Sequence, residues 1–184
     1  MRKVERSEIL PLEAYEARRG ELRAGAMQAK ALRRVHLGPA LTFLFENRET
    51  VRYQVQEMAR AERLFRPEEI QHELDTYNEL LGGPGELGCS LLIEIADPAE
   101  RDVKLRAWRG LPGHLYAVTA DGRRARARFD ARQVGEDRLS SVQYLSFEVG
   151  AEAPVGLGCD LPGLELEVRL APEQRAALAA DLAG

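Results

Sequence analysis

The stretch from Leu41 to Leu81 constrains the fold most, because the spacing of its apolar residues changes abruptly partway along. Leu41, Phe43 and Phe45 occupy alternate positions, which is typical of a short strand with one buried face. From Arg48 onward the apolar residues recur every three or four positions, which predicts a helix. This part of the chain therefore predicts a strand that leads directly into a helical region.

Two helices are expected within that region. Asn47 has a side-chain oxygen suited to cap the first helix, whose apolar stripe begins at Val51 and continues through Val55 and Met58. Pro67 is well placed as the first residue of the second helix. The apolar stripe of the second helix consists of Ile70, Leu74, Tyr77 and Leu81. Because the two helices are neighbours in sequence, we predict a helical hairpin with apolar facing sides.

Two acidic residues fall near the expected seam of this hairpin. Glu62 continues the stripe of the first helix, and Glu73 flanks the stripe of the second. A buried carboxylate needs a partner, and Arg48 cannot serve Glu62 because it lies roughly 21 Å away along the helix axis. Arg33 and Arg34 are candidate partners. A structural ion pair and a functional acid are therefore alternative interpretations of Glu62.

The remaining sequence divides at Gly82-Gly83-Pro84-Gly85, its strongest turn signal. Before it, residues 6–38 predict a helix that is broken near Gly20 to Gly25 and stopped by Gly38-Pro39. After it, the patterns predict strands at 89–95, 114–119, 123–129, 141–149 and 164–170, and helices at 98–109 and 171–182. The expected fold class is α+β: an N-terminal helical region with a helical hairpin packed on a mainly antiparallel sheet of about five strands, and a C-terminal helix. We expect one domain over 1–184, mainly helical in 1–81 and strand-rich in 86–184.

Composition and charge exclude several classes of function. The chain has 184 residues, of which 45% are hydrophobic, and no run approaches the roughly 18 apolar residues of a membrane span. No apolar signal segment follows Met1-Arg2-Lys3, so we expect a cytoplasmic protein without a membrane partner. The formal net charge of -4 argues against nucleic-acid binding over the whole surface. Cys89 and Cys159 stand alone and indicate neither a zinc site nor a disulfide framework.

One motif has the spacing of a metal ligand pair. Glu69 and His72 match the Glu-x-x-His spacing of di-iron helical bundles, but that chemistry needs two such copies and the chain has one. His72 also faces away from the apolar stripe. A metal-dependent enzyme or metal carrier that uses Glu62, Glu73 and a histidine such as His72 is an alternative hypothesis, and we assign no metal ligands.

Three arginines alternate along one predicted strand. Arg124, Arg126 and Arg128 would share one face about 6.8 Å apart, near the spacing of successive phosphates, so nucleic-acid binding is a further alternative. No aromatic residue interleaves on that face for base stacking. Cross-strand ion pairing explains the pattern better, because acids are available in the same sheet. These acids are Glu94, Glu148, Glu165 and Glu167.

The sequence contains no recognisable catalytic or cofactor motif. Ser140-Ser141 and the cysteines lack a nucleophile elbow and an adjacent base, and neither GxGxxG nor a P-loop is present. We therefore predict no cofactor and no self-sufficient catalytic set.

Several strings of residues point to a known family. The most specific are Thr42-Phe43-Leu44-Phe45-Glu46-Asn47-Arg48 and Gln54-Val55-Gln56-Glu57-Met58, accompanied by Lys30 to Val35, Leu37-Gly38-Pro39, Tyr77-Asn78, Val142 to Leu145 and Arg175 to Leu182. They resemble the bacterial family catalogued as domain of unknown function 3501, over nearly the whole chain. The resemblance implies no assigned reaction. It implies gene neighbourhoods that hold rubrerythrin-like and iron–sulfur proteins, and thus a link to peroxide or redox defence.

The sequence and the resemblance together predict an accessory protein that binds a partner without performing chemistry itself. The resemblance makes a rubrerythrin-like or iron–sulfur protein the expected partner. The predicted binding surface lies between residues 46 and 78 and consists of Glu46, Asn47, Arg48, Gln54, Glu57, Glu62, Glu73 and Asn78.

Overall fold

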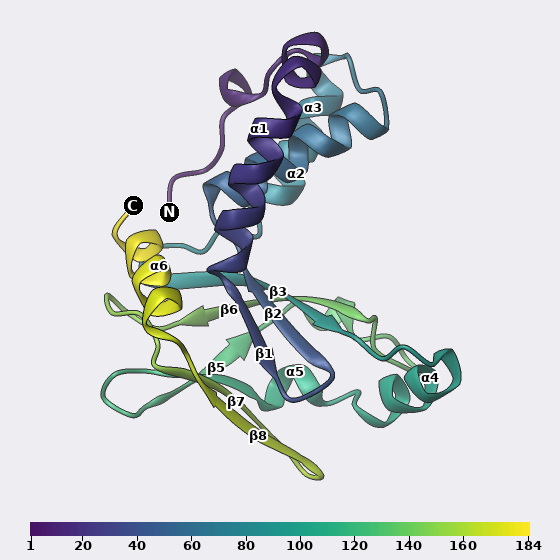
Figure 1. Cartoon of the computed structure of the whole chain (residues 1–184). Helices are drawn as coiled ribbons and strands as arrows, with labels where there is room; N and C mark the ends of the chain where they lie inside the picture. The colour runs from purple at the N-terminus through teal and green to yellow at the C-terminus, as the bar shows by residue number, and fades with distance from the viewer.

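Eight antiparallel strands form one sheet that curls nearly into a barrel, and three helices project from it as an arm (Figure 1). The structure is a computed structural model that describes residues 1–184. The strands are β1 (Arg34–Leu37), β2 (Leu41–Phe45), β3 (Glu86–Ile93), β4 (Leu115–Val118), β5 (Arg124–Arg128), β6 (Val142–Glu148), β7 (Gly156–Leu161) and β8 (Leu164–Arg169). The α-helices are α1 (Leu12–Ala31), α2 (Arg48–Ala61), α3 (Pro67–Asn78), α4 (Pro98–Ala107), α5 (Leu111–His114) and α6 (Pro172–Ala183). Short 3-10 turns occur at η1 (Arg6–Glu8) and η2 (Ala131–Gln133).

The strand order β1-β2-β3-β6-β5-β4-β7-β8 brings the two edge strands close together. A Cβ atom built on Gly38, at the end of β1, would lie 2.7 Å from the side chain of Leu166 in β8. At the same edge, the amide of Gln174 in α6 donates to the carbonyl oxygen of Arg34 at 2.6 Å. The predicted α+β class, antiparallel pairing and C-terminal helix are confirmed, whereas the prediction of about five strands is wrong.

The predicted helix over residues 6–38 is confirmed for Leu12–Ala31, but its predicted break and its predicted end are wrong. Helix α1 runs unbroken through Gly20 and Gly25 and ends at Ala31. The residues that follow form strand β1, in which Val35 is buried against the barrel interior. Gly38 has a φ of 65° in the turn to β2, so its left-handed backbone ends a strand and not a helix. Val35 fits a helical and a strand spacing equally well, which explains the error.

The barrel interior is filled by the inward side chains of alternate strand positions. The ring of Phe147 lies 6.4 Å from that of Phe43 and 6.1 Å from that of Phe45, measured between centroids. Leu178 of α6 and Leu111 of α5 belong to the same buried cluster. The helices outside the strands therefore bury their apolar side chains against the barrel core.

The arm consists of α1, α2 and α3 and has its own small core. The side chain of Asn47 accepts a hydrogen bond of 3.0 Å from the backbone amide of Thr50, and Pro67 lies in the first turn of α3, so both predicted helix starts are confirmed. Val51 and Val55 of α2 pack in one buried cluster with Leu74 of α3, as the apolar stripes indicated. No helix in the arm or elsewhere combines the length and apolarity needed to cross a membrane.

A very close backbone contact holds the end of α3 against the barrel. A Cβ atom on Gly88 of β3 would lie 1.7 Å from the carbonyl oxygen of Leu80, just beyond α3. Only glycine therefore fits at this position. The contact places α3 over the outer face of β3 and β6, where the candidate site lies.

Candidate functional site

The outer faces of β2, β3 and β6 form the floor of the site. Leu44, Ser90 and Tyr144 are directly paired across the three strands, so their outward side chains form one row. Leu92 and Val142 form the neighbouring row on the same face. Because successive residues of a strand point to opposite faces, this row lies outside the barrel, beneath the arm.

The arm supplies the roof. A partly open cavity of about 200 Å³ lies above that floor, lined by Val51 and Gln54 of α2, Tyr77 of α3, Leu80, and Lys30 from the last turn of α1. Three helices and three strands thus contribute to one cavity, which we call the arm cavity. Its lining combines aliphatic side chains with a few polar groups, as small-ligand sites do.

Glu46 is the most unusual group in the arm cavity. It lies between β2 and α2, is 7% exposed, and accepts a hydrogen bond on each carboxylate oxygen. The hydroxyl of Thr50 donates to one oxygen at 2.6 Å, and that of Ser90 donates to the other at 3.0 Å. The side chain of Glu46 forms no ion pair. Lys30, the cation in the lining, has its ammonium nitrogen 5.7 Å from the ring centroid of Tyr53.

The arm cavity shares Tyr77, Leu80 and Tyr144 with a larger groove of about 520 Å³, which we call the α3 groove. The α3 groove runs between α3 and the β5–β6 region, where Phe129 contributes to its wall. Tyr144 is 46% exposed and Phe129 is 37% exposed, so the groove presents aromatic surface to solvent. Burial raises the pKa of the Tyr77 hydroxyl, which remains a neutral hydrogen-bonding group.

The predicted residue Glu57 lies in the seam between α1 and α2. Its carboxylate accepts hydrogen bonds from Arg19 at 2.8 and 2.9 Å and from the hydroxyl of Tyr15 at 2.5 Å. The Arg19 guanidinium is the main reason that the pKa of Glu57 falls to about 2, and the Tyr15 hydroxyl lowers it further. Glu57 therefore joins two helices of the arm.

Two other predicted residues fix the segment that precedes α1. Arg48 donates to both carboxylate oxygens of Glu8 at 2.7 and 2.8 Å. The amide group of Asn78 accepts from the backbone amide of Val4 at 2.8 Å and donates to its carbonyl oxygen at 2.9 Å. Asn47 caps α2. These three side chains are occupied by contacts within the chain.

Glu62 is not trapped in the seam of the hairpin, so that expectation is wrong, whereas Glu73 of α3 is half-buried. Helix α2 ends at Ala61, and the exposed Glu62 forms its C-cap. Arg33, a candidate partner for Glu62, is paired with Asp181 instead. Glu62, Glu73 and the exposed His72 line one open hollow, but no group of three His, Cys, Asp or Glu residues is arranged to hold a metal ion.

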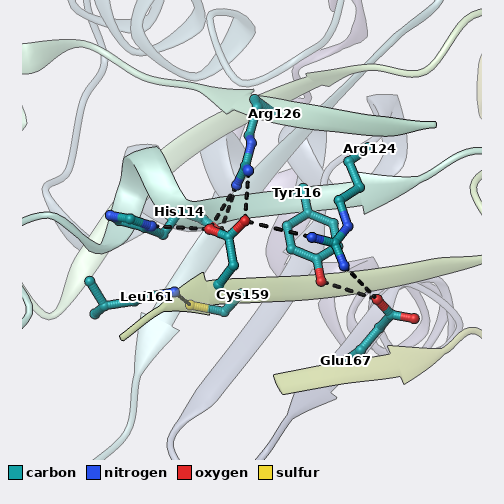
Figure 2. A network of polar contacts seen from close by, with 8 residues as sticks. His114, Tyr116, Arg124, Arg126, Cys159, Leu161 and Glu167 are labelled. Carbon is teal, nitrogen blue, oxygen red and sulfur yellow. Dashed lines mark hydrogen bonds and ion pairs between the residues drawn. The ribbon is translucent and has the colours of Figure 1, made fainter. Parts of the chain in front are cut away.

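The arginine face of β5 is engaged in cross-strand contacts, as the sequence indicated (Figure 2). Arg126 donates to Asp160 of β7 at 2.6 and 2.9 Å, and Arg124 lies 3.8 Å from Glu167 of β8. Hydrogen bonds from Arg126 hold the pKa of Asp160 well below its usual range. The guanidinium of Arg124 lies 4.3 Å from the ring centroid of Tyr116.

The third arginine and the nearby histidine complete this network. Arg128 pairs with Glu148 at 3.0 Å, and Nδ1 of His114 lies 3.0 Å from Asp160. Because each arginine already has an acidic partner, the nucleic-acid alternative gains no support from this face.

The two cysteines are inward-facing and buried. Burial raises the pKa of both the Cys89 and the Cys159 thiol, so both are thiols at neutral pH. The arm cavity has a hydroxyl in Ser90, which donates to the carboxylate of Glu46 and has no histidine beside it in the lining.

Sequence reasoning found Glu46 and Gln54 but missed Lys30, Ser90 and Tyr144 as members of the same site. Ser90 lies 44 residues from Glu46, and their contact depends on the β2–β3 pairing. One signal was available. Apolar Leu92 on the outward face of β3 indicates that this face is covered, and a small polar residue beside it then marks a polar site.

Comparisons with known proteins assign a family but no activity. A family model described as "Protein of unknown function (DUF3501)" matches residues 3–182. A crystal structure of a novel protein of unknown function from Burkholderia pseudomallei K96243 is similar, with a TM-score of 0.90 and 32% identity over 98% of this chain and 100% of that chain. No curated protein matches. The chain therefore belongs to the DUF3501 family of proteins of unknown function.

Proposed function

We propose that this chain is a binding protein whose α3 groove receives a segment of a partner protein. The main support for this proposal is that Tyr144 and Phe129 are exposed in a groove of about 520 Å³, which continues inward past Tyr77. Aromatic residues are enriched at protein interfaces, and exposed aromatic side chains in a concave surface are typical anchor positions. The groove offers a concave surface for a few residues of a partner.

The partner class follows from the family resemblance. An iron-containing redox protein of the rubrerythrin-like or iron–sulfur type is the partner that we propose. The binding surface we propose is narrower than the sequence indicated. It consists of the α3 groove with its aromatic residues, and of the predicted residues, Glu46 and Gln54 line the adjoining arm cavity. Arg48, Glu57 and Asn78 already hold the arm together through contacts within the chain.

Copurification of the tagged full chain with each candidate partner tests this proposal. We expect association at micromolar concentration, and we expect Tyr144→Ser to weaken it more than roughly tenfold because an aromatic anchor is lost. Phe65→Ser is the matched control, since Phe65 is 66% exposed and lies outside the groove. Arg48→Ala is a poor test because it also releases Glu8.

Absence of association with either partner class at tens of micromolar would contradict the proposal. Equal weakening by Tyr144→Ser and Phe65→Ser would also count against it, because the loss would then follow general surface apolarity and not the groove.

A further inference from the structure

We infer that the arm cavity is a binding site for a primary alkylammonium group, with Glu46 as its counter-ion. This inference concerns the inner cavity and stands whether or not a partner segment occupies the α3 groove.

Glu46 has an incomplete set of hydrogen-bond partners. Its carboxylate is 7% exposed and receives one hydroxyl hydrogen bond on each oxygen, from Thr50 and Ser90. A carboxylate has about four lone-pair positions, so acceptor capacity is left over. Burying a carboxylate without an ion-pair partner is costly, and a cation bound directly to it offsets that cost.

The space in front of the Glu46 carboxylate is lined mainly by apolar side chains. Leu44, Leu92 and Val142 of the floor and Val51 of the roof line the cavity. This aliphatic lining suits an unbranched hydrocarbon stem that carries a charged end to Glu46. A volume of about 200 Å³ suits a short aliphatic amine.

The arm cavity adjoins the α3 groove at aromatic side chains. Tyr77 and Tyr144 line both the arm cavity and the α3 groove, so a ligand that reaches the cavity from the groove meets aromatic side chains. Aromatic faces attract ammonium groups, and they also tolerate the hydrocarbon stem. Lys30 does not fulfil this role for Glu46, because its ammonium lies over the ring of Tyr53.

An alkylammonium group has two possible sources: a free aliphatic amine, or a lysine side chain of a segment in the α3 groove. Both place the same charged group against Glu46. The two sources differ in how much their binding depends on the α3 groove. A lysine side chain belongs to a peptide that must also contact Tyr144 in the groove, whereas a small amine binds in the arm cavity without such a contact.

Nuclear magnetic resonance titration of the full chain with pentylamine tests the inference. We expect saturable shifts of the backbone amide signals of Ser90 and Leu92, which line the cavity floor. We expect Glu46→Gln to weaken pentylamine binding roughly ten- to a hundredfold, because a hydrogen bond between charged groups is lost. Pentan-1-ol and pentanoate serve as neutral and anionic probes of the same length.

Three further variants make the test specific. Glu62→Gln removes an exposed acid outside the cavity and should leave pentylamine binding unchanged. Lys30→Met removes the other cation of the lining and should tighten binding. Leu92→Phe narrows the cavity and should abolish binding in a folded chain, which keeps the inference testable even if Glu46→Gln unfolds.

A capped lysine peptide, Ac-Leu-Lys-Leu-amide, separates the two sources. Peptide binding that is lost with Tyr144→Ser while pentylamine binding survives assigns the site to a lysine side chain, and pentylamine binding alone assigns it to a free amine. The inference is overturned if neither probe shifts the cavity signals, if pentanoate binds in preference to pentylamine, or if Glu46→Gln binds pentylamine as tightly as the natural chain.

Discussion

Arg33 and Asp181, which are 148 residues apart in sequence, form a two-bonded ion pair of 2.7 and 2.8 Å between the base of the arm and the C-terminal helix. Both side chains are less than 10% exposed. Asn47, the cap of α2, also donates to Asp181 at 3.3 Å. The pair therefore joins α1, α2 and α6 at the place where the arm meets the barrel.

Breaking that pair should strongly destabilise the chain. We expect Arg33→Ala or Asp181→Ala to lower the free energy of unfolding by roughly 3–5 kcal/mol, because each leaves a buried charge without its partner. Urea denaturation measures the change. Arg18→Ala is the control, since the Arg18–Glu21 pair is mostly exposed and its loss should change stability by less than about 1 kcal/mol. Equal effects of the buried and exposed variants would show that the junction is unimportant.

Acid should loosen the arm through Glu57. Its pKa is about 2 in the folded chain, below the ordinary value of 4.5, chiefly because of Arg19. A lowered folded-state pKa means that its contribution is complete above pH 4.5 and is lost as the pH falls toward 2.

The comparison of the natural chain with Glu57→Gln isolates this contribution, because other acids in the chain also have lowered pKa values. We expect the difference in urea midpoint between the two chains to shrink steadily between pH 4.5 and pH 2. A difference that stays constant over this range would mean that Glu57 does not titrate as described.

The two glycines of α1 should respond differently to alanine. Gly20 has no atom within 4 Å of a Cβ position, so Gly20→Ala should stabilise the chain by roughly 1 kcal/mol through helix propensity. A Cβ on Gly25 would lie 3.1 Å from a carboxylate oxygen of Glu49. Gly25→Ala should therefore gain less. Thermal unfolding of both variants checks the order, and a destabilising Gly20→Ala would contradict an unbroken α1.

Gly158 in β7 should not tolerate a side chain. A Cβ atom there would lie 2.3 to 2.5 Å from the ring and hydroxyl atoms of Tyr116. Displacing that ring also disturbs its hydrogen bond to Glu167, so Gly158→Ala should lower the free energy of unfolding by roughly 1–3 kcal/mol. Gly113→Ala, with open space at its Cβ position, is the control. Adding Tyr116→Ala to Gly158→Ala should cost less than the sum of the two single changes.

Local signals predicted much of the fold, and contacts distant in sequence account for what they missed. Asn47, Pro67 and the turn at Gly122 mark element boundaries through their own chemistry, so these were read correctly. Strand β7 was not predicted because Gly156 and Gly158 weaken the strand pattern. Glycine is required at both positions because atoms of the neighbouring strands lie where a Cβ atom would be.

The candidate site shows the same limit. Glu46 and Gln54 were found because they lie in a distinctive local string. Ser90 and Tyr144 join them only when β2, β3 and β6 align side by side. Glu62 was misjudged because α2 ends one residue before it, so the apolar stripe does not extend to its position.

The close approach of Gly88 to the carbonyl oxygen of Leu80 limits how far the end of α3 can move toward β3, beside the arm cavity that Leu80 lines. Backbone atoms meet there without an intervening side chain, so the end of α3 cannot move closer to β3. Any adjustment of the cavity to a ligand at this end is then left to the side chains of Tyr77 and Tyr144, which line it. Side-chain rotations of this kind need no domain hinge, so we expect the arm cavity to accept slender, flexible molecules more readily than bulky, branched ones.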